Sequence, residues 1–348
     1  MPDQMPLWEA LPATLRRFNY TESLPRTAGS YLRVMAELER LRDRETPVVL
    51  TFSVFEDFVR VWHRFMASAT KGKWQIVIGD SSGAMDPEKF PGAKLIRVPN
   101  HLYHGKKIDL LLRHVIGPQP VFLCDDDMYP LFDPSPYLEK LVPPDVAAVS
   151  LHPRPWFQFE IDGVRHDPMG SFALLFKPEI FAKEGLRFQP PQGIESARKV
   201  FAEGAKHLKT YDTGDYANEQ LILRGYKILT ERHQGFIGYD GMTAPRLVLQ
   251  RFGKDWMKTA IERSEHYLTG STNAAVLKAM IGSVSFERLY RALFREEPKV
   301  VSGFTDPELA GIIESNPRLK PEDKTRLHDY RRRLEETERR LISYAAHV

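Results

Sequence analysis

Three consecutive aspartates, Asp125, Asp126 and Asp127, are the residues whose types and spacing most directly indicate chemistry. They follow the short apolar run 121–124, so we expect them at the end of a buried strand. Carboxylates crowded at a strand end repel one another, and burying them unpaired is costly. A divalent cation such as Mg²⁺ or Mn²⁺ compensates, because it takes oxygen ligands and commonly bridges protein carboxylates to substrate phosphates. The alternative is a solvated turn that caps the next segment.

Two lysines, Lys106 and Lys107, indicate a complementary anion site. The segment 104–107 reads His-Gly-Lys-Lys and opens a predicted helix whose apolar residues recur at 108, 111, 112 and 115. Free N–H groups at a helix start favour phosphate, and the lysines add positive charge there. A site in which the aspartates bind a metal and the neighbouring lysines bind phosphates would suit a nucleotide diphosphate. The alternative for the two lysines is an ordinary solvated helix start.

The elements that must position these residues alternate between strands and helices. Strands are predicted at 48–53, 74–79, 93–98 and 121–124, and helices follow the first and third of them. This order predicts a Rossmann-like α/β fold with a mostly parallel sheet and right-handed crossovers. Ligands of such sheets bind beyond the carboxyl ends of the strands. The first strand ends in Thr51, Phe52 and Ser53, and the second leads into Asp80, for which an Asx turn is the alternative.

The rest of the chain predicts two more strands, a helix and a final strand, followed by helices alone. The strands are expected at 146–151, 171–176 and 226–229, with a helix over about 216–224. A capping box at 305–308 and Pro321 mark later helix starts, and the last helix carries apolar residues in heptad spacing. We therefore expect an N-terminal helical extension (1–45), an α/β domain (46–250) and a helical C-terminal region (251–348).

Composition narrows the possible functions. The chain has 348 residues with 49 Lys+Arg and 46 Asp+Glu, a balance that excludes a nucleic-acid binder driven by a large basic face. Its single cysteine excludes a disulfide framework and a cysteine-based zinc site, and it suits a reducing compartment. Neither a secretory signal nor a run of 18 apolar residues is visible. We expect a cytoplasmic protein with no membrane span.

The stretch from about 48 to 239 resembles a GT-A glycosyltransferase, most of all the broad family-2 type that uses nucleotide-diphospho-sugars. Residues 120–127 match that family's DXD element, an apolar strand ending in Asp-x-Asp. Residues 76–82 resemble its second-strand motif, 49–53 its first strand, and 105–107 the helix that approaches the nucleotide. Residues 169–176 resemble the small-residue turn and strand beside the acceptor. The resemblance implies a GT-A fold with a helical C-terminal extension.

On the donor side, the resemblance implies a nucleotide-sugar site with a metal. Asp125 and Asp127 would hold Mn²⁺ or Mg²⁺ and the donor, and Asp80 would contact the base. The remaining donor contacts would come from Thr51, Phe52, Ser53, Lys106, Lys107 and Asp126. The donor would be a UDP- or GDP-sugar, and the metal would neutralise charge on the leaving diphosphate. Since some GT-A enzymes place a histidine late in the domain, His233 is a third metal-ligand candidate; the alternative is a surface or core-edge histidine.

On the acceptor side, the sequence departs from the family. Many inverting members carry an Asp or a Glu-Asp pair at the start of a helix that ends in Gly-Tyr, where a base deprotonates the acceptor hydroxyl. Here Asp215 is the best-placed carboxylate, with Asp212 and Glu219 as substitutes, and a helix N-cap is its alternative role. The acceptor would lie near Trp156, Gly170 and Ser171. Trp156 could instead pack on the core.

The leading hypothesis is therefore a metal-dependent glycosyltransferase of the hexosyltransferase type, acting on an unidentified acceptor hydroxyl. One alternative is an Asp-nucleophile phosphohydrolase, because these enzymes also use Asp-x-Asp after an apolar strand. Another is a catalytically inert sugar-nucleotide binder or scaffold that works through its C-terminal helices. The heptad-spaced helix would pack on its own domain or pair in a homodimer.

Overall fold

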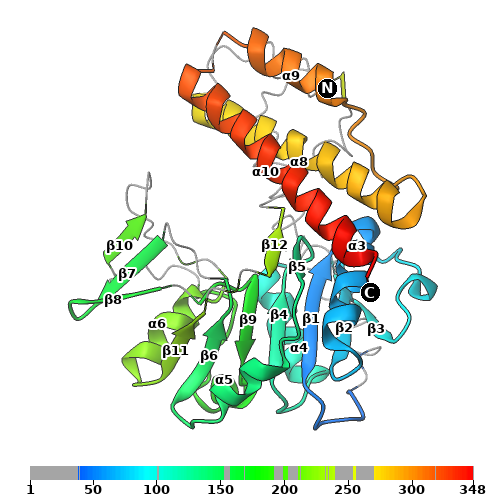
Figure 1. Cartoon of the computed structure of the whole chain (residues 1–348). Helices are drawn as coiled ribbons and strands as arrows, with labels where there is room; N and C mark the ends of the chain where they lie inside the picture. The colour runs from blue at the N-terminus through cyan, green and yellow to red at the C-terminus, as the bar shows by residue number, and fades with distance from the viewer. Residues whose placement is uncertain are drawn as a thin grey trace, which may run out of the picture. The chain divides into compact units, whose positions relative to one another are not determined.

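The chain is described from a computed structural model (Figure 1). The structure describes residues 38, 40–99, 102–152, 157–167, 169–191, 199–202, 211, 213–231, 233, 235–239, 254–255, 270–317 and 319–347. Most of the predicted N-terminal helix, Trp156 and Asp212 lie outside these residues. The chain divides into two compact units: one contains Trp62–Phe236 with the described residues from 38 to 55, and the other contains Glu56–Val61 with the described residues from Ile237 onward.

A seven-stranded sheet forms the centre of the first unit, in the order β11-β6-β9-β4-β1-β2-β3 (Figure 1). Its strands are β1 (Val48–Ser53), β2 (Gln75–Asp80), β3 (Ala93–Arg97), β4 (Val121–Cys124), β6 (Val146–Ser150), β9 (Ala173–Phe176) and β11 (Lys227–Thr230). All neighbours run parallel except β9, which lies antiparallel between β4 and β6. The predicted α/β fold with a mostly parallel sheet is confirmed.

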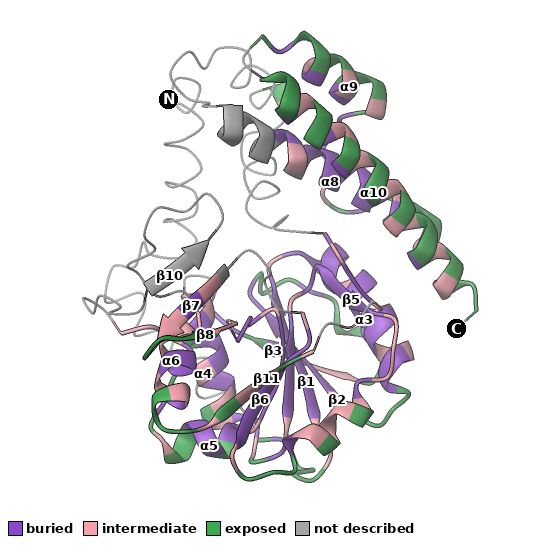
Figure 2. Ribbon diagram, turned by 60° about the vertical axis from the view of Figure 1, so that its left-hand side comes forward, coloured by how far each residue is buried: buried purple, intermediate pink, exposed green. Residues whose placement is uncertain are grey.

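Helices cover both faces of this sheet. The unit contains α4 (His104–His114), α5 (Pro178–Lys183), α6 (Asp215–Leu223) and the later part of α3 (Glu56–Thr70). On one face, Ile108 of α4 and Leu221 of α6 join Leu50 and Leu123 in a single buried core. On the other face, Trp62 of α3 donates a hydrogen bond from Nε1 to Cys124 Sγ at 3.4 Å. The inner strands β1, β4, β6 and β9 are wholly buried (Figure 2), as their continuous apolar runs predict, whereas the edge strands β3 and β11 are partly exposed.

Shorter elements extend this unit at its edges. The 3₁₀ helices span Pro87–Lys89 and Ser135–Leu141, and the short strands are β5 (Met128–Pro130), β7 (Phe157–Ile161), β8 (Val164–His166) and β10 (Lys199–Ala202). Only the first residue of β12 (Phe236–Gly238) belongs to this unit. β7 pairs antiparallel with β8 and with β10. The turn between β7 and β8 places Asp162 and Gly163 at positive φ, the geometry of a two-residue hairpin. Sequence analysis missed this small sheet, because its strands are short and one face is polar.

The second unit contains α8 (Gly270–Phe294), α9 (Asp306–Ser315) and α10 (Pro321–Ala345). Leu327, Tyr330, Leu334 and Leu341 of α10 are buried, and α10 packs along α8. The heptad-spaced side chains are therefore used within the chain, the first of the two predicted alternatives.

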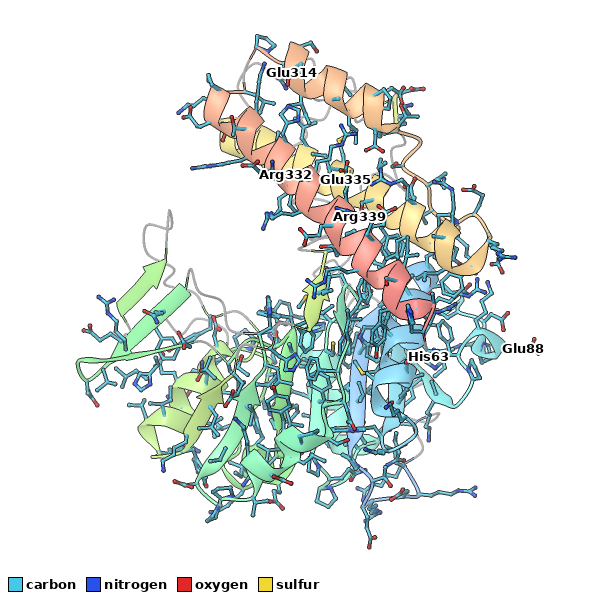
Figure 3. All side chains as sticks on the ribbon, in the orientation of Figure 1. His63, Glu88, Glu314, Arg332, Glu335 and Arg339 are labelled. Carbon is cyan, nitrogen blue, oxygen red and sulfur yellow. The ribbon has the colours of Figure 1, made fainter. Side chains whose placement is uncertain are left out.

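Local signals placed the later helix ends correctly. Thr305 and Glu308 form the predicted capping box of α9, and α10 begins at Pro321. α10 carries charged side chains, among them Arg332, Glu335 and Arg339 (Figure 3). Arg332 pairs with Asp329 at 2.9 Å, and Glu335 pairs with Arg331. Among the described residues, no helix is long and apolar enough to cross a membrane.

Candidate functional site

The carboxyl ends of β1 and β2 lie side by side. The Ser81 N–H donates to the Ser53 carbonyl at 2.8 Å, and the Ser53 hydroxyl accepts from the Phe55 N–H at 2.9 Å. The Phe52 ring lies over the backbone of Gly79, where a Cβ would approach it to 2.3 Å. Thr51 is completely buried, and its hydroxyl has no hydrogen-bond partner among the described residues. Of the three residues predicted at this strand end, Phe52 thus contributes mainly to packing.

Asp80 holds the loop that follows β2. Its Oδ1 accepts from the N–H and hydroxyl of Ser82 and from the Gly83 N–H, and its Oδ2 accepts from the Met85 N–H at 3.2 Å. The carboxylate is almost wholly buried. These local bonds are the Asx-turn type of contact that sequence analysis gave as the alternative for Asp80. They bring Ser81 and Ser82 to the sheet edge.

Lys107 is a buried cation at this edge. Its Nζ donates to the Ser81 hydroxyl at 2.9 Å, and only 7% of the residue is exposed. Among the described residues, no carboxylate lies within ion-pair distance of this ammonium group. Burial lowers the pKa of Lys107 to about 8, because desolvation penalises the charged form. Lys106, by contrast, is exposed.

Asp125 and His104 meet at the same edge. The His104 Nε2 lies 3.9 Å from Asp125 Oδ1, and roughly a third of each side chain is exposed. The Phe52 ring contacts His104 edge-on, with ring centroids 5.5 Å apart. Asp126 and Asp127 are nearly buried, so Asp125 is the most accessible carboxylate of the three. Sequence analysis did not single out His104, although it is the first residue of α4.

A clamp made by Asp109 joins α4 to the start of α6. The Asp109 carboxylate accepts from the Phe188 N–H at 2.8 Å and from the Gln189 N–H at 3.0 Å. The Phe188 carbonyl in turn accepts from the Gly214 N–H at 2.9 Å, one residue before Asp215. Burial raises the pKa of Asp109, which these two N–H donors partly oppose. Sequence analysis missed Asp109; the available signal was one carboxylate within a largely apolar helix.

The predicted acceptor residues lie around the start of α6. A Cβ on Gly214 would approach Met169 to 3.2 Å, so the turn that contains Gly170 and Ser171 contacts this helix end. Asp215 is the first residue of α6 and is half-buried. Glu219 is nearly buried, and both of its carboxylate oxygens lie 3.0 Å from the Tyr211 hydroxyl. The two candidate bases thus differ in accessibility.

His233 and Cys124 have structural partners. The His233 ring stacks on Phe132 with centroids 3.6 Å apart, and its Nδ1 accepts from the Gly235 N–H at 3.0 Å. Burial lowers the pKa of His233. This is the core-edge environment given as its alternative. Cys124 is fully buried beside Trp62, and burial raises the pKa of its thiol. Within the described part of the chain, no group of three His, Cys, Asp or Glu side chains is arranged to hold a metal ion.

A cavity of about 380 Å³ lies elsewhere on the first unit. Residues at the starts of β2 and β3 line it, together with Arg40 and Arg42. This is the amino edge of those parallel strands, whereas the predicted site residues lie at the carboxyl edge. Parallel sheets bind ligands at the carboxyl edge, so we place the candidate site at the strand ends and not in this cavity.

The chain matches known proteins in its structure alone, and only weakly. A scan against protein families and a search of curated proteins find no match. Among the solved structures that match is the apo form of WbbM, a bifunctional glycosyltransferase, at 11% identity and a TM-score of 0.24. The match covers 84% of this chain and 53% of that one, so this chain spans about half the length of WbbM. At this TM-score and identity the likeness is weak.

Proposed function

We propose that this chain is a glycosyltransferase that binds a nucleotide-diphospho-sugar and a divalent cation at the carboxyl ends of β1, β2 and β4. The observation that supports this most is Lys107. Among the residues that the structure describes, this buried cation has no carboxylate partner, so its lost hydration is not offset there by an opposite charge. An anionic ligand at the start of α4 would supply that charge, and the free N–H groups of the helix would add to it.

The residues around Lys107 suit the parts of such a donor. Lys107 and the start of α4 would neutralise the phosphates, and Ser81 orients the ammonium group through the 2.9 Å hydrogen bond. Asp125 is accessible and supplies the oxygen ligands that Mg²⁺ or Mn²⁺ prefers. When bound, the cation would offset the negative charge that develops on the leaving diphosphate.

The acceptor would bind near the turn at Gly170 and Ser171, beside the start of α6. Asp215 is the better candidate for the base, since it is half-buried and its carboxylate begins the helix. Glu219 is the second candidate, because it lies one turn further along and the Tyr211 hydroxyl already donates to it. A base here would take the proton from the acceptor hydroxyl as the sugar is transferred.

A catalytically inert nucleotide-sugar binder is the second candidate function. It is favoured by the environment of Glu219, whose two oxygens are both in contact with Tyr211. The two functions share the donor site and differ only in turnover. Binding without donor hydrolysis or sugar transfer would favour the inert binder.

A thermal-shift screen tests the shared donor site. UDP-, GDP- and dTDP-sugars are each added with and without Mn²⁺, and binding to the folded state should raise the melting temperature. At a ligand concentration of 100 times Kd, the stabilisation is about 2.7 kcal/mol. Replacing Asp125 with Asn should abolish the Mn²⁺-dependent part, because Asp125 is the accessible carboxylate of the three. Asp145→Asn is the matched control, because Asp145 is a half-buried carboxylate that immediately precedes β6 and pairs with Lys227. No shift with any of the donors would refute the proposal.

A further inference from the structure

We propose that His104 is a ligand of the divalent cation, acting with Asp125, in the place that sequence analysis gave to His233. The inference rests on the proposed function and specifies how its donor site holds the metal. Its basis is the approach of His104 to Asp125 at the carboxyl edge of the sheet.

The separation of the two side chains suits a shared cation. At 3.9 Å, Nε2 and Oδ1 are too far apart for a hydrogen bond. Two donors at about 2.1 Å from one cation lie about 3.0 Å apart in adjacent octahedral positions and about 4.2 Å apart in opposite ones. The observed distance of 3.9 Å falls between these limits, so a small rotation of either side chain would let both atoms bind one cation.

The surroundings of His104 hold its ring in place. The edge-on contact with Phe52 sets the direction of the imidazole. Gly105 packs closely against the backbone of Phe188 and Gln189, where an added Cβ would lie 2.7 Å away. This contact holds the start of α4 in place.

Accessibility distinguishes this pair from the other candidate ligands. A cation that arrives with a nucleotide must reach its protein ligands from solvent, and the side chains of His104 and Asp125 are 35% and 38% exposed. Asp127 is only 9% exposed, and the ring of His233 is stacked on Phe132. Two protein ligands are enough, because Mg²⁺ sites commonly take one or two carboxylates and fill the remaining positions with phosphate oxygens and water.

Electron paramagnetic resonance of bound Mn²⁺ tests the assignment directly. The full chain is labelled with nitrogen-15 at histidine only and mixed with Mn²⁺ and unlabelled UDP or, separately, GDP. A histidine ligand produces a nitrogen-15 coupling in the pulsed spectrum that the nucleotide nitrogens cannot produce. We expect this coupling in the wild type, its loss in His104→Gln and its retention in His233→Gln. His104→Asp should lose the coupling yet still bind Mn²⁺, because a carboxylate replaces the imidazole.

The outcomes separate the inference from the proposed function. A coupling that persists in His104→Gln, or that disappears in His233→Gln instead, would overturn the assignment. Mn²⁺-dependent nucleotide binding without any nitrogen-15 coupling in the wild type would also overturn it, while leaving the donor site intact. If the wild type shows no Mn²⁺-dependent nucleotide binding, the assignment fails together with the metal-dependent function. The wild-type spectrum requires no variant, so the test does not depend on how any substitution folds.

Discussion

Replacing Lys107 with methionine should stabilise the fold and weaken anion binding at the same time. The folded protein holds the pKa of Lys107 at about 8, compared with 10.5 for an ordinary lysine. Each pKa unit corresponds to about 1.4 kcal/mol, so the buried charge costs about 3 kcal/mol at neutral pH. Methionine removes that cost but also the hydrogen bond to Ser81, worth about 1 kcal/mol. The net gain is about 2 kcal/mol, or roughly 4–8 °C in melting temperature.

The pH dependence has a defined sign. Between pH 8 and 10.5 the lysine keeps its proton in the unfolded state but has lost it in the folded state. The free energy of unfolding of the wild type therefore rises with pH in this range. The penalty is fully present below about pH 8 and is lost by about pH 10.5. The advantage of Lys107→Met over the wild type should therefore shrink across this range.

Urea unfolding at pH 7, 9 and 10.5 measures the stability difference, and calorimetry with UDP and Mn²⁺ measures binding. Lys106→Met is the matched control, since the neighbouring lysine is exposed and should change stability by less than about 0.5 kcal/mol. We expect Lys107→Met to lower the nucleotide affinity at least tenfold. A variant that is less stable than the wild type at pH 7 and binds the nucleotide equally well would refute the reasoning.

Three further predictions concern packing. Gly105→Ala should destabilise the first unit by more than about 2 kcal/mol in urea unfolding, because the added Cβ would meet the 188–189 backbone. The control is Gly311→Ala in α9, where the added Cβ has open space and should stabilise the helix by about 0.5–1 kcal/mol. Equal effects of the two substitutions would contradict the contact with the 188–189 backbone. Asp109→Ala should cost about 3 kcal/mol in the same assay, because two N–H groups lose their acceptor, and a cost below about 1 kcal/mol would show that water replaces it. Cys124 should react with a thiol reagent such as DTNB only after urea unfolds the chain, and rapid labelling of the native protein would be inconsistent with its burial.

Much of the fold was predictable because its signals are local. The apolar, β-branched runs at 48–53 and 121–124 became β1 and β4, and the capping box at 305–308 begins α9. Each of these depends on the side chains of neighbouring residues and on hydrogen bonds that span a few positions. The sheet direction followed from connection lengths, because a strand joined to its neighbour through a helix runs parallel to it. The antiparallel direction of β9 and the small β7-β8-β10 sheet were not predicted.

The sequence by itself determined that carboxylates and lysines would collect at one edge of an α/β sheet. Only the tertiary structure decided which of them face one another. The hydrogen bond from Lys107 to Ser81 spans 26 positions, and the clamp from Asp109 to Phe188 spans 79. Such pairs depend on strand order and helix packing, which no local pattern specifies. Burial follows from the same long-range packing: it made Lys107 a desolvated, costly cation and left Asp125 accessible beside His104.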